Sequence, residues 1–355
     1  MIGLLMPKPK TTKKLTSTVM EKGRRPTSYD VARIAGVSQS AVSRCFAANA
    51  SIAPAKRELI LKVAAEIGYK PNALAQALIS KRTNIVALII SAQTNLYYPE
   101  VLAELSTRLN ERDIRVLLFA LSAESDVDDV LDQIWRHSVD GVISAARLSA
   151  AQVALFAEHR VPLVLYNRAA AAAPSVRCDS ISGERDLVEQ LLAAGHRRFG
   201  LIAGPRDNYV GEERRMAVLA TLSQSGIDDV DEIKGDFSYR SGHAAMHELV
   251  EQAGKLDAVI AVNDLMAIGA MDAARIDLQL DIPKDLSIVG FAGAGPAQWG
   301  SYDLTSVRQP VRRMTDAAVS MLIERIEDGS APPEQRLFAG ELLRGSSARL
   351  GLGAI

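Results

Sequence analysis

Residues 27–46 read TSYDVARIAGVSQSAVSRCF, and this stretch predicts two short helices joined by a tight turn. Thr27, followed three residues later by Asp30, resembles a capping box and predicts where the first helix begins. Gly36 supplies a left-handed turn residue, and Ser38 can cap the second helix. Two helices joined in this way form the helix-turn-helix that reads DNA. The alternative interpretation is a small three-helix bundle with polar outer faces.

The second predicted helix, residues 39–46, turns polar side chains outward that suit base edges and phosphates. Its N-terminal end is expected to enter the major groove. The expected base contacts, or their immediate neighbours, are Gln39, Ser40 and Arg44, and the expected phosphate contacts are Tyr29, Ser38 and Ser43. A third helix is expected from Pro54, a favoured first-turn residue, to Gly68.

The charge of the chain is unevenly divided. The formal net charge is −1 over 355 residues, but residues 1–82 carry 15 Lys and Arg against 4 Asp and Glu. The head is therefore basic (+11) and the remainder acidic (−12). A basic head on an acidic body is typical of polyanion binding by the head, and the alternative is a solvated basic tail. The composition, 48% hydrophobic and 23% charged, excludes a fibrous or wholly disordered chain.

The cysteines and the apolar runs indicate the compartment. Cys45 and Cys178 lie in different regions, so they predict neither a disulfide framework nor a metal site. No apolar run reaches the roughly 18–20 residues that span a bilayer, and the start lacks the order of a secretory signal. We therefore expect a cytoplasmic protein with reduced thiols and no membrane partner. Residues 1–26, rich in Lys, Thr, Ser and Pro, are predicted to be a disordered basic arm.

Residues 73–80, ALAQALIS, are good helix formers with no packing partner in their own sequence. So short a helix is marginal in water and needs a surface on which to dock. Two such helices from a dimer, meeting over DNA, would satisfy this need. Leu78 would then be an apolar wedge in the minor groove. The alternative is an ordinary linker.

Three segments, TSYDVARIAGVS (27–38), AVSR (41–44) and GYKPNA (68–73), resemble the head of the lactose-repressor/galactose-repressor family of bacterial transcription regulators. The resemblance continues to about Arg349. It implies a homodimeric repressor that binds a pseudo-palindromic operator and is switched by a small molecule. It also implies that a hinge helix carries Ala75 and Leu78 into the minor groove, with Asn72 beside the DNA.

From Thr83 onward, apolar runs alternate with amphipathic helical stretches such as residues 98–112 and 211–226, which predicts buried parallel sheets. The expected strands are residues 85–91, 115–120, 141–145, 162–166, 199–203, 232–237, 258–262 and 287–291. The two sets of four have similar spacing. We therefore expect a two-lobed, periplasmic-binding-protein-like α/β body of two Rossmann-like subdomains behind an all-α head, with ligands bound where the strands end.

The expected domain limits follow from these patterns and from the resemblance, which implies that the chain crosses between the lobes near residues 182, 307 and 337. The predicted parts are a basic arm (1–26), a helix-turn-helix domain (27–70), a hinge helix (71–82) and an effector-binding and dimerisation domain (83–350). Within the last, the N-subdomain is expected at about 83–182 plus 307–336 and the C-subdomain at about 183–306 plus 337–350.

Polar and aromatic side chains follow the predicted strands, a mixture that suits a hydroxyl-rich ligand. The expected effector contacts are Tyr97, Tyr98, Asn167, Asn208, Arg214, Phe237 and Asn263. All of these except Asn167 match effector-contacting positions of the family that the chain resembles. Arg214 is the strongest candidate, because its guanidinium can bind a hydroxyl or carboxylate with two hydrogen bonds. The alternative is a surface salt bridge with Glu212 or Glu213.

One departure from the family concerns the effector. Relatives often carry an Asp after the eighth strand, where this chain has Ala292. The missing carboxylate favours an acidic effector, a sugar acid or hydroxy acid, over a neutral sugar.

Several other arrangements predict nothing further. His243 and His247 would share a helix face, but the sequence indicates no third ligand, so we expect no metal and no cofactor. There is no phosphate-binding loop ending in Gly-Lys-Ser/Thr and no nucleophile elbow. The chain is therefore predicted to be a transcription regulator and not an enzyme. The alternatives are a cytoplasmic solute-binding protein or an α/β enzyme without a role at DNA.

Overall fold

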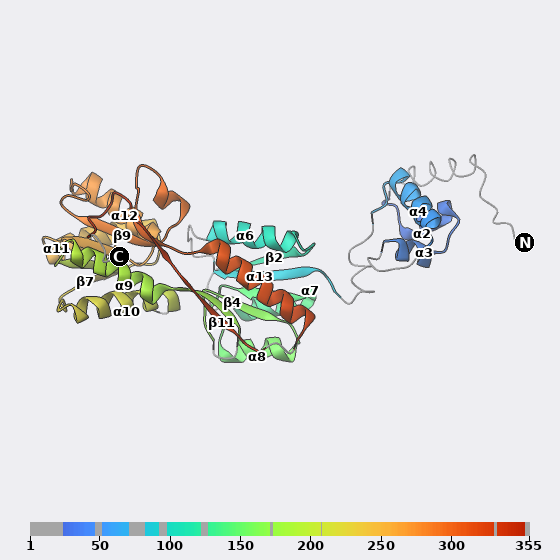
Figure 1. Cartoon of the computed structure of the whole chain (residues 1–355), viewed down its shortest axis with the longest axis horizontal. Coiled ribbons are helices and arrows are strands. Elements are labelled where there is room, and N and C mark those ends of the chain that lie inside the picture. Colours follow the sequence, from blue (N-terminus) through green and yellow to red (C-terminus); the bar gives the residue numbers. More distant parts are fainter. Residues whose placement is uncertain are drawn as a thin grey trace, which may run out of the picture. The chain divides into compact units, whose positions relative to one another are not determined.

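The computed structural model describes residues 24–46, 52–70, 82–91, 98–121, 127–170, 173–206, 208–329 and 332–351. The chain divides into two compact units, Met1–Thr83 and Asn84–Ile355, here termed the head and the body (Figure 1). Some sequence predictions lie outside the described residues: the basic arm up to residue 23, almost all of the hinge helix with Asn72, Ala75 and Leu78, and Tyr97.

The head contains three described helices, α2 (Ser28–Ala35), α3 (Gln39–Cys45) and α4 (Pro54–Glu66). Apolar side chains from each helix form one buried cluster, to which Val31 of α2, Val42 of α3 and Ile60 of α4 contribute with no exposed surface. This arrangement confirms the helix-turn-helix that the sequence predicts.

The turn between α2 and α3 forms as its residue types predict. Gly36 has φ +63° in the left-handed region, where a residue without a Cβ atom is unstrained. The Ser38 hydroxyl accepts a hydrogen bond from the Ala41 amide (3.2 Å) and so caps α3. At the other end of α2, the Asp30 carboxylate accepts from the Thr27 amide (2.9 Å).

The first lobe of the body is built on a six-stranded parallel sheet. Its strands are β1 (Ile85–Ser91), β2 (Arg115–Leu121), β3 (Gly141–Ser144), β4 (Leu163–Tyr166), β5 (Ser175–Asp179) and β11 (Gln335–Ala339). Their order is β11-β5-β4-β3-β1-β2. Its helices are α6 (Tyr98–Asn110), α7 (Val127–His137), α8 (Ala150–Glu158) and α13 (Val311–Glu327).

Helices cover both faces of this sheet because its strands alternate between two apolar faces. Val86 and Leu88 of β1 join a buried cluster with α6 and α13. Ala87 and Ile89 join a second cluster with α7 and α8. A strand buried on both sides needs a continuous apolar run, which explains why β1 is visible in the sequence.

The second lobe repeats this plan. Its strands are β6 (Phe199–Ala203), β7 (Asp231–Lys234), β8 (Ala258–Ala261), β9 (Ser287–Ala292), β10 (Thr305–Arg308) and β12 (Glu341–Leu343). Their order is β12-β10-β9-β8-β6-β7, and only β12 is antiparallel to its neighbour. The accompanying helices are α9 (Ser180–Ala193), α10 (Tyr209–Gln224), α11 (Tyr239–Ala253), α12 (Asp264–Asp272), a π-helix η2 (Ala273–Asp277) and a 3₁₀ helix η3 (Gly295–Gln298).

The chain passes between the two lobes three times: from β5 to α9, from β10 to α13, and from β11 to β12. In Figure 1 the red helix α13 and strand β11 accordingly lie among the teal and green elements of the first lobe. The two-lobed α/β body that the sequence predicts is thus confirmed. One predicted strand, residues 232–237, is present as β7 but ends earlier than expected, at Lys234, and Phe237 lies in a bend with φ +68°.

Among the described residues, no helix combines the length and the apolar character needed to cross a bilayer.

Candidate functional site

The exposed face of α3 is the candidate DNA-reading surface. Ser40 and Arg44 are exposed and Gln39 and Ser43 are half-buried, while the apolar residues of the helix point into the head. The Gln39 amide donates to the Ser28 hydroxyl (3.3 Å), and Arg44 donates from Nε to the Ser40 carbonyl (3.3 Å). These bonds are made within the head and leave polar groups of the α3 face open to a partner.

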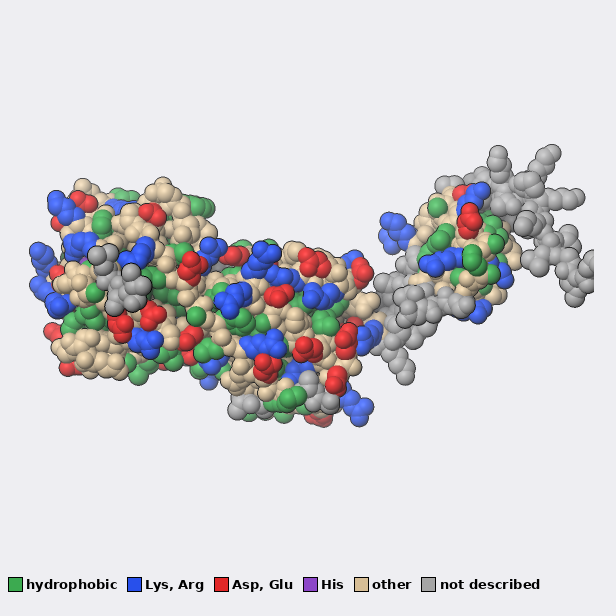
Figure 2. All heavy atoms as spheres, in the orientation of Figure 1, with side chains coloured by type: hydrophobic (Ala, Val, Ile, Leu, Met, Phe, Trp, Pro, Cys, Tyr) green, Lys and Arg blue, Asp and Glu red, His purple; other side chains and the backbone are tan. Residues whose placement is uncertain are grey.

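The surface of the head is strongly basic. Its described residues include nine Lys and Arg side chains, all of them exposed: Arg24, Arg25, Arg33, Arg44, Lys56, Arg57, Lys62, Lys70 and Arg82. One of the three carboxylates, Asp30, is buried and forms ion pairs with Arg24 (2.8 Å) and Arg33 (3.3 Å). Among the charged side chains on the face of the head in Figure 2, Lys and Arg predominate over Asp and Glu, whereas both signs are interspersed on the body. Tyr29, predicted to contact phosphate, is 71% exposed.

Arg214 occupies the carboxyl edge of the second sheet. It extends from α10 and is only 4% exposed. One terminal nitrogen donates to the carbonyl of Val262, just after β8 (2.8 Å), and the guanidinium carbon lies 3.8 Å from the centre of the Phe291 ring on β9. Arg215 pairs with Glu212 (3.0 Å), and Arg177 pairs with Glu213 (3.2 Å). Burial at the strand ends therefore favours the predicted site role of Arg214 over a surface salt bridge.

Two buried carboxylates lie within electrostatic reach of Arg214. Asp264 accepts hydrogen bonds from the Ser306 hydroxyl (2.6 Å) and the Ala294 amide (2.7 Å). Glu184 of α9 has no exposed surface, and neither of its oxygens has a hydrogen-bond partner within the described parts of the chain. Burial raises the pKa of Glu184 to about 8 and that of Asp264 to about 6, while the Arg214 charge opposes both shifts.

Three further predicted residues meet beside this cluster. Asn263 donates to the Phe237 carbonyl (3.0 Å) and accepts from the Met266 amide (2.9 Å), so both ends of its amide are engaged. The Phe237 ring fills the space above Gly204, where an added Cβ would lie 2.4 Å from a ring carbon. Asn208 caps α10 by accepting from the Gly211 amide (3.0 Å). These side chains therefore help to form the edge of the second lobe, in addition to being predicted contacts for an effector.

In the first lobe, Asn167 lies where β4 ends, with φ +50°. Its amide nitrogen donates to the Gln309 side chain (2.7 Å), and its oxygen accepts from the Cys178 amide (3.0 Å). Gln309 belongs to the segment that crosses between the lobes. Tyr98 is the first residue of α6 and directly follows residues 92–97, which the structure does not describe.

A cavity of about 580 Å³ takes its walls almost entirely from the first lobe, with Tyr209 added from the second. None of the effector contacts predicted from the sequence is among the described residues that line it. Arg147, Ser149 and Gln152 follow β3, and Arg168 follows β4. Tyr209, the first residue of α10, closes the cavity from the second lobe and accepts a hydrogen bond from Arg177 (3.0 Å). The cavity lies at the carboxyl ends of the first sheet, the position at which open α/β sheets bind ligands.

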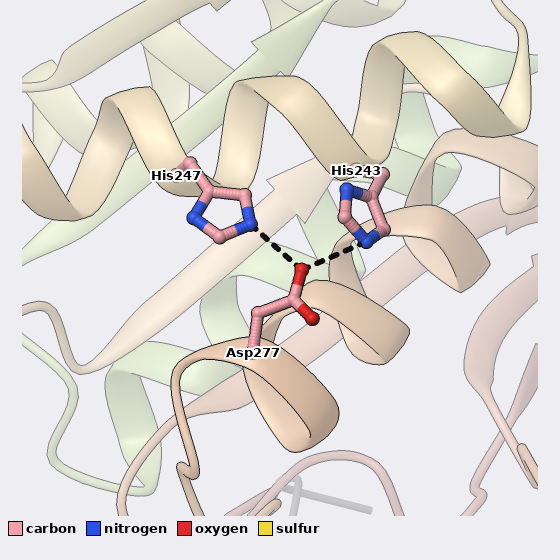
Figure 3. A group of neighbouring side chains, drawn as sticks. All are labelled: His243, His247 and Asp277. Atoms are coloured by element: carbon pink, nitrogen blue, oxygen red, sulfur yellow. Dashed lines mark hydrogen bonds and ion pairs between the residues drawn. The ribbon is translucent and has the colours of Figure 1, made fainter.

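Sequence reasoning did not place Glu184, Arg147 or Tyr209 in the site, because each looks like an ordinary polar residue of a helix or loop. It also found no third ligand for His243 and His247, which the fold supplies as Asp277 (Figure 3). These residues come together only through contacts between segments far apart in the chain.

Comparisons with known proteins give consistent results. Residues 27–72 match the family described as bacterial regulatory proteins, lacI family, and residues 188–348 match a periplasmic binding protein-like domain. The HTH-type transcriptional regulator CelR of Thermobifida fusca is 31% identical over 336 residues, which cover 91% of this chain and 98% of CelR.

Two solved structures resemble most of the chain. A CelR–cellobiose complex has a TM-score of 0.68 at 29% identity and covers 91% of this chain and 100% of that one. A lac repressor dimer bound to operator and the anti-inducer ONPF has a TM-score of 0.84 at 24% identity, covering 91% and 99%. At 24% identity, the similarity to the lac repressor structure shows a shared fold alone.

Proposed function

The chain belongs to the lacI family of bacterial regulatory proteins and is a DNA-binding transcription regulator; from this premise we propose that it represses transcription as a cytoplasmic homodimer on a pseudo-palindromic operator. A small molecule bound between the lobes of the body would switch it. The observation that carries the proposal is the exposed polar face of α3 on a basic head, joined to a body with a cavity between two lobes.

We propose that α3 enters the major groove. Gln39, Ser40 and Arg44 would read base edges, because amide, hydroxyl and guanidinium groups match the donors and acceptors displayed there. Tyr29, Ser38 and Ser43 would hold phosphates and position the helix. The hinge contacts proposed from the sequence, Asn72, Ala75 and Leu78, complete this DNA-binding set.

The proposed effector contacts are those of the sequence analysis, Tyr97, Tyr98, Asn167, Asn208, Arg214, Phe237 and Asn263, with Glu184 added. The proposed ligand is a sugar or a sugar acid. The CelR relative whose structure is described as a cellobiose complex supports this class. Carboxylates near Arg214 can accept from hydroxyls, and the cavity arginines can donate to hydroxyls or to a carboxylate.

The sequence argument for an acidic effector loses its basis in the structure. It rested on Ala292, which lacks the carboxylate of relatives. Asp264, whose pKa burial raises only to about 6, places another carboxylate within electrostatic reach of Arg214 and supplies a negative charge there at neutral pH. Glu184, with its pKa raised to about 8, is mostly protonated at that pH and adds little charge. Neutral sugars are therefore as well matched to this lobe as sugar acids.

The proposed switch couples the two sites through lobe closure. Arg177 of the first lobe donates to Tyr209 and Glu213 of the second, so these contacts depend on the angle between the lobes. A ligand that prefers one angle shifts the population of the operator-binding form by its difference in affinity for the two forms. The hinge segments of a dimer would transmit this angle to the two heads.

Selection of genomic fragments by the full chain tests the DNA-binding role. We expect recovery of a pseudo-palindromic sequence, with binding that falls steeply as salt rises because Lys and Arg release counterions from phosphates. Equal retention of random duplex, with and without sugars, would contradict the proposal. Turnover of a recovered ligand would support the enzyme alternative.

A thermal-shift screen of sugars and sugar acids on the full chain tests the effector site, because binding raises the melting temperature by mass action. Arg214→Ala should abolish the shift and leave operator binding intact. Arg215→Ala is the matched control, since Arg215 is the next residue on α10 but pairs with Glu212 and Glu232. A response retained in the Arg214 variant would remove Arg214 from the site.

A further inference from the structure

Two histidines and one carboxylate converge on the second lobe, on elements separate from those that line the interlobe cavity. His243 and His247 are one turn apart on α11, and Asp277 is the last residue of η2. The Nε2 atoms of His243 and His247 lie 3.1 and 2.9 Å from the same oxygen, Oδ2 of Asp277 (Figure 3). Both rings therefore direct a nitrogen toward one point.

The spacing of these atoms fits a zinc ion. Zinc binds imidazole nitrogen at about 2.0–2.1 Å and carboxylate oxygen at about 2.0–2.2 Å, so ligand atoms around a tetrahedral ion lie roughly 3.3 Å apart. The three ligand atoms here lie within 4.8 Å of one another. The two distances to Asp277 Oδ2, 3.1 and 2.9 Å, are already close to that spacing.

The backbone that carries the cluster is held tightly. Gly242 of α11 approaches α12 so closely that an added Cβ would lie 2.1 Å from the Met266 carbonyl oxygen. Gly269 of α12 approaches the Tyr239 carbonyl oxygen to the same degree. The π-helix η2 continues directly from α12, and its wide turn brings Asp277 beneath the two rings. The ligands are thus preorganised by their supporting helices.

The exposure of the cluster leaves room for a further ligand. The side chains of His243, His247 and Asp277 are 33%, 38% and 38% exposed. Three protein ligands with an open fourth position is the arrangement of zinc sites that keep a water molecule. Imidazole and carboxylate ligands together suit borderline divalent ions such as Zn²⁺ better than Mg²⁺ or Ca²⁺, which prefer oxygen alone.

We propose that His243, His247 and Asp277 bind one zinc ion per chain, with water as the fourth ligand. The ion links α11 to η2 and stabilises the second lobe. The competing explanation is a pair of histidine–aspartate interactions with no affinity for metal.

Metal titration of the full chain distinguishes these explanations. After treatment with EDTA and dialysis, calorimetry with ZnCl₂ should show one site per chain, and Co²⁺ should give the visible absorption of tetrahedral coordination. His243→Ala, His247→Ala and Asp277→Asn should each weaken zinc binding by more than the roughly 10- to 100-fold that loss of an outer-shell partner costs. Circular dichroism establishes that the variants remain folded.

The chain offers a matched control. It has five histidines, and His137 is an exposed one on α7 of the first lobe. His137→Ala should bind zinc as the unaltered chain does. The proposal is overturned if the unaltered chain binds no zinc at one equivalent, or if folded His243→Ala and His247→Ala chains bind it as tightly as the His137 variant.

Discussion

Replacing Glu184 by glutamine removes a buried titratable carboxyl group while keeping the size of the side chain. The Glu184 carboxylate has no exposed surface and no hydrogen-bond partner among the described residues. Burial raises its pKa from the ordinary value of 4.5 to about 8, with Arg214 acting in the opposite direction. Keeping this group protonated at neutral pH, where the unfolded chain ionises it, should therefore cost the folded chain stability.

The sign and size of the effect follow from proton linkage. Between pH 4.5 and about 8 the folded chain retains a proton on Glu184 that the unfolded chain has lost. The stability due to this group is therefore complete below the unfolded pKa and is lost as the pH rises through the folded pKa. The slope is at most about 1.4 kcal/mol per pH unit, which gives an upper bound of about 5 kcal/mol over the interval.

Urea unfolding at several pH values measures this directly. Both tryptophans, Trp135 and Trp299, belong to the body, so their fluorescence reports on the body alone. The free energy of unfolding of Glu184→Gln should equal that of the unaltered chain near about pH 5 and exceed it by a few kcal/mol near about pH 8.5. Glu189→Gln, an exposed change on the same helix, should show no such divergence. A stability difference that is constant with pH would refute the reasoning and show that Arg214 keeps Glu184 ionised.

Three further outcomes are expected. Asp30→Asn should destabilise the head by about 1–2 kcal/mol at neutral pH, seen by hydrogen exchange in the full chain; because hydrogen bonding from Arg24 lowers the Asp30 pKa, the difference should vanish as the pH falls through that lowered pKa. Gly242→Ala should lower the unfolding free energy of the body by about 3 kcal/mol, because the new Cβ would meet the Met266 carbonyl oxygen; tryptophan fluorescence during urea unfolding would show it. Gln39→Ala should cost about 1–3 kcal/mol of operator binding and relax specificity at one base pair, measured by fluorescence anisotropy on single-base variants.

The sequence predicted those features that depend on local rules. Gly36 and Ser38 act at the turn of the head as their residue types require. Strands buried on both faces, such as β1 and β6, can be recognised in the sequence as apolar runs. The four strands absent from the sequence analysis, β5, β10, β11 and β12, are short and carry polar residues, and two of them are added after long excursions of the chain.

The candidate site was predicted only in part, for a related reason. Arg214 and Asn263 follow strands, so a rule about strand ends finds them. Glu184 lies on a helix among other polar residues, and only the three-dimensional packing buries it near Arg214. Asp277 is 30 residues from its partner His247, beyond the reach of any helical spacing. Phe237 was assigned to a strand because it is apolar, although its ring packs over glycines from a turn.

The triple passage of the chain between the lobes has a consequence for biosynthesis. Helix α13, which packs against β3, β4 and β5, and strand β11, which pairs with β5, both leave the ribosome after nearly the whole of the second lobe. A nascent chain halted at residue 300 would have a face of the first sheet covered by α6 but not yet by α13, and an open edge on that sheet, together with a second sheet that lacks β10 and β12. Both lobes therefore reach completion almost together, within several seconds of each other at roughly 5–20 residues per second. Prematurely terminated chains would expose surfaces that chaperones and proteases recognise, while the small head, finished long before, would already be able to fold.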